Sequence, residues 1–161
     1  MEIKLITVDY NHPQQGKDLV MLLNGYAIDP MGGGEPLSDF VQQNLVATLA
    51  KQSHVFTVLC YVDGEPAGIV NCVEGFSTFS CMPLVNIHDV GVLTKFRGLG
   101  LSAIMLNEVE KIAREKGCCK LTLEVLEGNT IAQKAYKKLG FAGYELNPEM
   151  GKAMFWQKKL S

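Results

Sequence analysis

Hydrophobic residues along the chain follow two spacings, one typical of strands and one typical of helices. Runs rich in β-branched and aromatic residues predict strands, whereas apolar positions three or four residues apart predict helices. The expected strands cover residues 3–8, 54–62, 67–76, 84–92, 120–126, 141–146 and 153–159. The expected helices cover residues 12–28, 38–51, 101–116 and 129–139, with Ser38 as a helix cap.

Two connections predict how neighbouring strands run. Residues 63–66 read Asp-Gly-Glu-Pro, a tight turn signal that predicts an antiparallel hairpin of the strands on either side. The 101–116 helix separates two strands, so it predicts a parallel crossover. The expected sheet therefore contains strands of both directions.

A glycine-containing turn follows the strand that ends at Val92. Residues 97–102 read Arg-Gly-Leu-Gly-Leu-Ser and lead directly into the 101–116 helix. Glycines let the main chain approach a ligand closely, and the free N–H groups of a first helical turn point at an anion. Arg97 adds a permanent cation at the mouth of the turn. This pattern predicts a phosphate site, although a glycine pair alone is also typical of an ordinary strand-to-helix turn.

Composition narrows the classes of partner. The 161 residues suit one domain, and a net charge of -2 without a Lys/Arg cluster argues against nucleic acid or a membrane surface as the main partner. No apolar run is long enough to span a bilayer. The five cysteines are odd in number and form no C-x-x-C pair, and no signal peptide is evident. These features favour reduced thiols and a cytoplasmic location.

Two spaced motifs resemble those of the GNAT superfamily of N-acetyltransferases. They are Val92-x4-Arg97-Gly98-x-Gly100 before a helix, and Asn129-x2-Ala132-x3-Tyr136-x3-Gly140-Phe141. The resemblance covers residues 54–160, whereas the segment before it matches only in its order of one strand and two helices. Residues 87–89, Ile-His-Asp, are also similar to the strand before the turn in the diamine acetyltransferase branch.

The resemblance implies a single α/β (α+β) domain over residues 1–161, with a mixed, mostly antiparallel sheet and helices on both faces. The sheet would splay open after the strand that ends at Val92, and acetyl-CoA would lie in the split and leave as CoA. Its pyrophosphate would lie on the turn and its pantetheine arm along the strand. The implied cofactor residues are Val90, Gly91, Val92, Arg97, Gly98, Leu99, Gly100, Leu101, Ser102, Ala103, Asn129, Ala132 and Tyr136. Ser102 stands where the family has Gly or Ala, and it is small enough to leave the backbone donors free.

A dinucleotide site is the rival interpretation of the same turn. Residues 98–103 also satisfy G-x-G-x-x-G/A, the fingerprint of a nicotinamide-nucleotide fold. That motif belongs in a parallel βαβ unit with an acidic residue about 20 positions later. Here the preceding strands form hairpins and Glu124 lies farther on, which disfavours NAD and NADP.

Acetyl transfer to an amine needs a deprotonated nucleophile, a polarised carbonyl and a proton for the leaving thiolate. Tyr136 matches the family tyrosine that meets the CoA sulfur; the alternative is a helical tyrosine that only packs on the sheet. His88 stands where the diamine branch has a glutamate base, and Asp89 is the second candidate. Each could instead be a structural residue beside a bulged strand, with water carrying the proton. No metal is expected.

The segment between the first two helices is acidic and rich in glycine. Asp29 and Glu35 there would favour a cationic acceptor, although a surface loop without function fits equally well. We therefore expect an acetyl-CoA-dependent N-acetyltransferase that modifies a primary amine of a small molecule or peptide. A non-catalytic acyl-CoA-binding module is the competing hypothesis, and assembly as a homodimer is left open.

Overall fold

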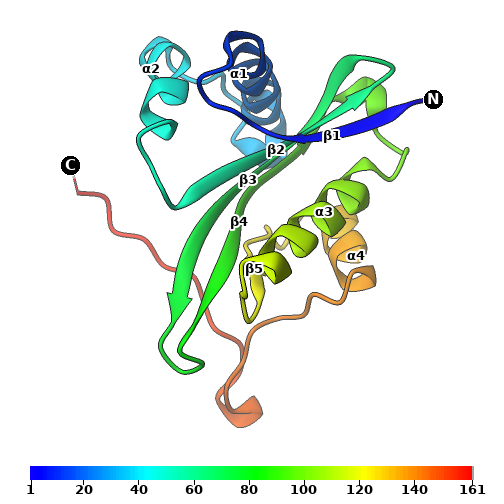
Figure 1. The fold of residues 1–161 in the computed structure, drawn as a ribbon. Coiled ribbons are helices and arrows are strands. Elements are labelled where there is room, and N and C mark those ends of the chain that lie inside the picture. The colour runs from blue at the N-terminus through cyan, green and yellow to red at the C-terminus, as the bar shows by residue number, and fades with distance from the viewer. Residues whose placement is uncertain (161) are drawn as a thin grey trace. The chain divides into compact units, whose positions relative to one another are not determined.

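The computed structural model describes residues 1–160 (Figure 1). The chain divides into two compact units, Met1–Leu126 and the segment from Glu127 onward. The expectation of one domain over the whole chain stays a prediction. Within residues 1–160, no helix combines the length and apolar character that crossing a membrane requires.

The first unit is built on a five-stranded sheet in which the strands follow one another in sequence order. The strands are β1 (Ile3–Thr7), β2 (Val55–Val62), β3 (Glu65–Ser77), β4 (Met82–Val92) and β5 (Leu121–Leu123). Strands β1 to β4 pair antiparallel, and β5 pairs parallel with β4. The predicted mixed, mostly antiparallel sheet is confirmed.

Four α-helices form close to the predicted positions. They are α1 (Pro13–Ile28), α2 (Asp39–Leu49), α3 (Leu101–Glu115) and α4 (Thr130–Lys138), the last of which belongs to the second unit. Short 3-10 turns lie at η1 (Pro30–Gly32), η2 (Thr94–Phe96) and η3 (Pro148–Met150). The Ser38 hydroxyl accepts a hydrogen bond from Val41 N at 3.3 Å, so Ser38 is the cap of α2 that the sequence predicts.

Helices cover both faces of the sheet in the first unit, with α1 and α2 on one side and α3 on the other (Figure 1). On the α1 face, Leu19 and Leu22 pack against Leu59 and Ile69. On the α3 face, Met105 comes so close to the sheet that a Cβ added to Gly68 would lie 2.8 Å from its Cε. Alternate residues of each strand therefore serve two separate cores.

Strand β4 changes its pairing at His88. On the β3 side, Ile87 pairs with Cys72 and Asp89 pairs with Asn71, so His88 is an extra residue in a β-bulge. On the β5 side, Ile87 is also the last paired residue. Because a bulge bends its strand, β4 leaves β5 at this point, and residues 88–92 have an open edge. The sheet opens between β4 and β5, as expected.

The end of the chain differs from the prediction. The expected strands at 141–146 and 153–159 do not form, although one main-chain hydrogen bond of 2.8 Å runs from Ala153 N to Tyr144 O. A two-stranded ribbon needs a covered apolar face, but Tyr144 and Phe155 are 53% and 74% exposed. The expected 120–126 strand shortens to β5 because its partner β4 turns away after Ile87.

Candidate active site

The turn between β4 and α3 has a backbone that favours glycine. Gly98 and Gly100 have φ angles of +80° and +73°, in the left-handed region. A Cβ added at either position would meet no atom within 4 Å, so the backbone angle rather than crowding selects glycine here. Both residues therefore leave an open surface in front of the turn.

This turn presents a row of main-chain donors. Among the hydrogen bonds of residues 1–160, none is donated by the main-chain N–H groups of residues 98–103. Gly100 caps α3 without a side-chain hydrogen bond, and the first helical bond is Ile104 N to Gly100 O at 3.2 Å. The N–H groups lie at the positive end of the α3 dipole, with Leu101 buried behind them. An anion such as a pyrophosphate fits this arrangement.

The open edge of β4 adds main-chain groups next to the turn. Leu93 N donates to Ala67 O of β3 at 2.9 Å. Because main-chain groups alternate in direction along a strand, Gly91 also faces β3, whereas Val90 and Val92 face the open edge. An extended ligand could pair with these two residues as an additional strand would.

Arg97 connects this turn to the segment after α1. Its Nε donates to Val92 O at 3.1 Å, and its Nη2 lies 2.6 Å from Asp29 Oδ2. The hydrogen bond from Arg97, followed by one from Met31 N, lowers the pKa of the Asp29 carboxyl. A predicted cofactor residue and a predicted acceptor residue are thus in direct contact, and the guanidinium is held by Asp29. Glu35 lies exposed after η1.

The two candidate bases lie in different surroundings at the bulge. His88 is exposed, and its Nδ1 lies 2.9 Å from Asn86 Oδ1, while Asn86 Nδ2 donates to Thr122 Oγ1 at 2.9 Å. With the amide in this orientation, Nδ1 donates and the neutral imidazole has its lone pair on Nε2. Asp89 is half-buried, and its Oδ2 accepts from Asn71 Nδ2 at 3.0 Å.

Tyr26 of α1 lies beside Asp89, although no motif in the sequence points to it. A Cβ added to Gly91 would lie 2.9 Å from Tyr26 Cβ, so the helix crosses β4 closely at this point. Burial, followed by the nearby carboxylates of Asp89 and Asp29, raises the pKa of the Tyr26 phenol. In the sequence Tyr26 is one of several apolar positions in a helical pattern, and nothing in that pattern marks it as a neighbour of Asp89.

The second unit holds the remaining predicted residues. The Asn129 side chain accepts from Ala132 N at 3.2 Å and caps α4. The ring of Tyr136 meets Phe141 edge to face, with 6.0 Å between their centroids. The roles of these residues at the cofactor stay predictions.

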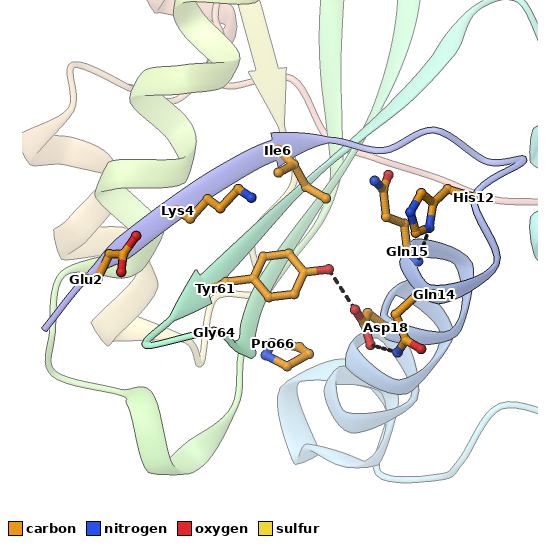
Figure 2. A pocket seen from close by; sticks show the side chains of 10 residues that line it. All are labelled: Glu2, Lys4, Ile6, His12, Gln14, Gln15, Asp18, Tyr61, Gly64 and Pro66. Carbon is orange, nitrogen blue, oxygen red and sulfur yellow. Dashed lines mark hydrogen bonds between the residues drawn. The ribbon is translucent and has the colours of Figure 1, made fainter.

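A separate hollow of about 450 Å³ lies between β1, α1 and the β2–β3 turn (Figure 2). At its side the Tyr61 hydroxyl donates to Asp18 Oδ2 at 2.7 Å, and Gln14 Nε2 donates to Asp18 Oδ1 at 2.9 Å. None of the predicted site residues lines it. Both oxygens of the buried Asp18 are therefore occupied, one by Gln14 within α1 and the other by Tyr61, which joins α1 to β2 next to the β1 edge of the sheet.

Known proteins are similar in sequence to large parts of this chain. The sequence profile of the acetyltransferase (GNAT) family matches residues 21–141. Thialysine N-epsilon-acetyltransferase of Bos taurus is 36% identical over 83 residues, 48% of each protein, so the chain spans about half the length of such curated relatives. Aminoglycoside N(6')-acetyltransferase type 1 of Salmonella typhimurium is 24% identical over 117 residues, 69% of this chain and 74% of the relative.

Solved structures agree on the fold. The aminoglycoside acetyltransferase AAC(6')-Iy, in complex with the bisubstrate analogue CoA-S-monomethyl-acetylneamine, superposes with a TM-score of 0.76 at 19% identity and 99% coverage of both chains. A probable acetyltransferase reaches a TM-score of 0.77 at 18% identity and the same coverage. At these identities the likeness concerns the fold alone.

Proposed function

Since the chain belongs to the acetyltransferase (GNAT) family, we propose that it transfers the acetyl group of acetyl-CoA to a primary amine of a cationic small molecule or peptide. The observation that carries this proposal is the β4–α3 turn, whose unpaired N–H groups at residues 98–103 adjoin the open edge of β4. One end of this surface suits a pyrophosphate and the other suits an extended amide-containing arm.

The cofactor is proposed to bind along this surface with its pyrophosphate at the turn and its thioester toward the bulge. Its pyrophosphate accepts from the N–H groups of the turn, and its pantetheine arm pairs with Val90 and Val92. The thioester then lies near the bulge at His88, where β4 and β5 separate. Asn129, Ala132 and Tyr136 are proposed to contact the cofactor, because they stand at the positions of the family motif.

Two side chains, His88 and Tyr136, are proposed to transfer protons during the reaction. His88 Nε2 takes a proton from the acceptor ammonium, directly or through water, so that the amine nitrogen can attack the thioester carbon. As the N–C bond forms, the attacking nitrogen passes its second surplus proton to water; the C–S bond then breaks, and the Tyr136 hydroxyl protonates the departing thiolate and is reprotonated from solvent. Main-chain N–H groups near Val90 stabilise the oxyanion. Asp89 holds the positive charge of the acceptor.

The proposal that the acceptor is cationic rests on charge. Asp89 and Asp29 both lie near the Tyr26 phenol, and their two negative charges outnumber the one positive charge of Arg97, which pairs with Asp29. A carboxylate steers and orients a cationic partner more strongly than a neutral one. The names of the relatives, which include thialysine and aminoglycoside acetyltransferases, describe acceptors that carry additional amines.

Two measurements test this function. Acetyl-CoA and CoA should raise the melting temperature, by an amount equivalent to about 2.7 kcal/mol at 100 times the dissociation constant, whereas NAD and NADP should not. Release of CoA is then followed with a panel of diamines, polyamines, amino sugars, lysine analogues and peptide N-termini. Binding of CoA without release for any amine would favour the non-catalytic module, and stabilisation by NAD instead of CoA would refute the cofactor site.

A further inference from the structure

We propose that Tyr10, Thr57 and Asn71 are positioning residues for acetyl transfer, because they form a one-way hydrogen-bond chain that orients the Asp89 carboxylate toward the acceptor. This inference rests on the proposed function, in which Asp89 binds a cationic amine. No motif of the sequence points to these three residues, which come from the β1–α1 connection, β2 and β3.

Strand register brings three members of the chain into one line. Thr57 of β2 pairs with Asn71 of β3, and Asn71 pairs with Asp89 of β4. Directly opposed residues of antiparallel strands project from the same face, so these side chains form a polar row across the sheet. The row lies on the α1 face, since Leu59 and Ile69, two positions away from Thr57 and Asn71, belong to the core under α1.

The hydrogen bonds in this row all point the same way. Asn71 Nδ2 donates to Asp89 Oδ2 at 3.0 Å, and Thr57 Oγ1 donates to Asn71 Oδ1 at 2.7 Å. A threonine hydroxyl has one hydrogen, and Thr57 uses it toward Asn71. In the 2.9 Å contact between Thr57 Oγ1 and the Tyr10 hydroxyl, Tyr10 is therefore the donor. Every dipole of the chain presents its positive end toward Asp89.

Burial makes the loss of any hydrogen bond in this hydrogen-bond chain costly. Thr57 is only 1% exposed, and the part-buried Tyr10 packs against the core under α1. A polar group buried without its partner loses the hydrogen bond and also its hydration, so the Asn71 amide depends on Thr57 for a fixed orientation. A flipped amide would turn its carbonyl oxygen toward Asp89 and repel the carboxylate.

The hydrogen-bond chain occupies only one of the two Asp89 carboxylate oxygens. Within residues 1–160, the hydrogen bonds of this carboxylate all use Oδ2, and Oδ1 takes part in none. Gly91 lies next along β4 on this face, and Tyr26 packs directly against it, since a Cβ added to Gly91 would lie 2.9 Å from Tyr26 Cβ. We therefore assign Oδ1 to the ammonium group of the acceptor, with the chain setting its direction.

Hydroxyl deletions along the chain test this assignment. Thr57→Val keeps the shape of the side chain and removes its hydroxyl, so kcat/KM for the best amine of the panel should fall about tenfold, the value of one buried hydrogen bond. The loss should lie in the KM for the amine, with the KM for acetyl-CoA unchanged. Thr57→Ser restores the hydroxyl and should recover activity, and Tyr10→Phe should cause a smaller loss in the same parameter.

Tyr61→Phe is the matched control, because the Tyr61 hydroxyl also donates to a carboxylate, that of Asp18 in α1, on the same face of the sheet but toward its β1 edge. It should lower the melting temperature and leave the KM for the amine unchanged. Equal effects of Thr57→Val and Tyr61→Phe on that KM, or a native KM in Thr57→Val, would reduce the chain to a structural feature. If the wild-type protein acetylates no amine, the proposed function fails. Thr57→Val and Tyr61→Phe are then compared by the dissociation constant of 1,4-diaminobutane for the CoA-bound protein.

Discussion

The proposed site has a cofactor half and an acceptor half, and the two are built from different kinds of chemical group. The cofactor half consists of main-chain groups from one continuous segment, residues 90–103, with glycines at its exposed turn. The acceptor half consists of side chains from β2, β3, β4 and the β1–α1 connection, joined by hydrogen bonds across the sheet. One half depends on local backbone angles, whereas the other depends on strand register.

This difference predicts how each half responds to substitution. Main-chain donors cannot be removed one at a time, so the cofactor half should fail completely when a side chain covers the turn. The acceptor half can be weakened one hydrogen bond at a time, and each bond has a modest net value. Large losses in affinity for CoA and graded losses in acceptor recognition are the expected pattern.

The largest effect is expected for Gly100→Val. A branched side chain at this position would cover the N–H groups where the pyrophosphate binds, so the dissociation constant of CoA should rise by about 100-fold or more. Gly117→Val is the control, because Gly117 has nearly the same φ, +74°, and equally open surroundings after the other end of α3. The backbone strain is therefore matched in the two variants.

Calorimetric titration with CoA compares these two variants after each has been shown to fold by its melting curve. Similar affinities in Gly100→Val and Gly117→Val would move the phosphate site away from the turn. That result would also remove the basis for regarding the cofactor half as a main-chain site.

Tyr136→Phe tests whether the cofactor half also uses a side chain. The change removes one oxygen and keeps the ring against Phe141, so packing should persist. If the phenol protonates the thiolate, kcat should fall about 100-fold with acetyl-CoA saturating. The dissociation constant of CoA should change by less than about tenfold, the loss of one hydrogen bond.

Tyr144→Phe removes the same atom elsewhere in the second unit and should leave kcat unchanged. A folded Tyr136→Phe variant with native kcat, measured where chemistry limits the rate, would remove this residue from the mechanism. Water would then supply the proton, and the cofactor half would act through its main chain alone.

The contrast between the halves also explains what the sequence could predict. The Gly98–Gly100 turn, the Ser38 cap and the hairpin at residues 63–66 are local signals, and the structure contains each of them. No local sequence pattern marks Thr57 and Asn71 as site residues, because their proposed role depends on which residues lie opposite them once the sheet has formed.

The strands predicted at 141–146 and 153–159 failed for a related reason. Their short runs of apolar and aromatic residues are a local signal, but a strand also needs a partner and a covered face. Leu146 and Trp156 have neither in the described structure, where both are strongly exposed. Pattern alone thus predicts a strand only when the surrounding sheet can accept it.

The smallest effect is expected for Asp29→Asn, which removes the ion pair between Asp29, after α1, and the Arg97 side chain at the phosphate turn. Asp29 holds the Arg97 guanidinium at 2.6 Å and adds a negative charge near the phosphate turn. The substitution should release Arg97 toward the pyrophosphate and tighten CoA binding by about two- to fivefold, while the KM for a cationic amine should rise. The tightening should shrink at high salt, because Arg97 is 52% exposed.

The pH dependence of this contact has a definite sign. Arg97 lowers the pKa of Asp29, so the ion pair contributes stability above the ordinary pKa of an aspartate and loses it as pH falls through the lowered value. Acidification of the wild-type protein should therefore reproduce the effect of Asp29→Asn on Arg97. Glu65→Gln, which breaks the exposed pair with Lys95 beside the same turn, is the control for a general charge effect. If it tightens CoA binding as much as Asp29→Asn does, the two halves are coupled by net charge and not by the contact between Asp29 and Arg97.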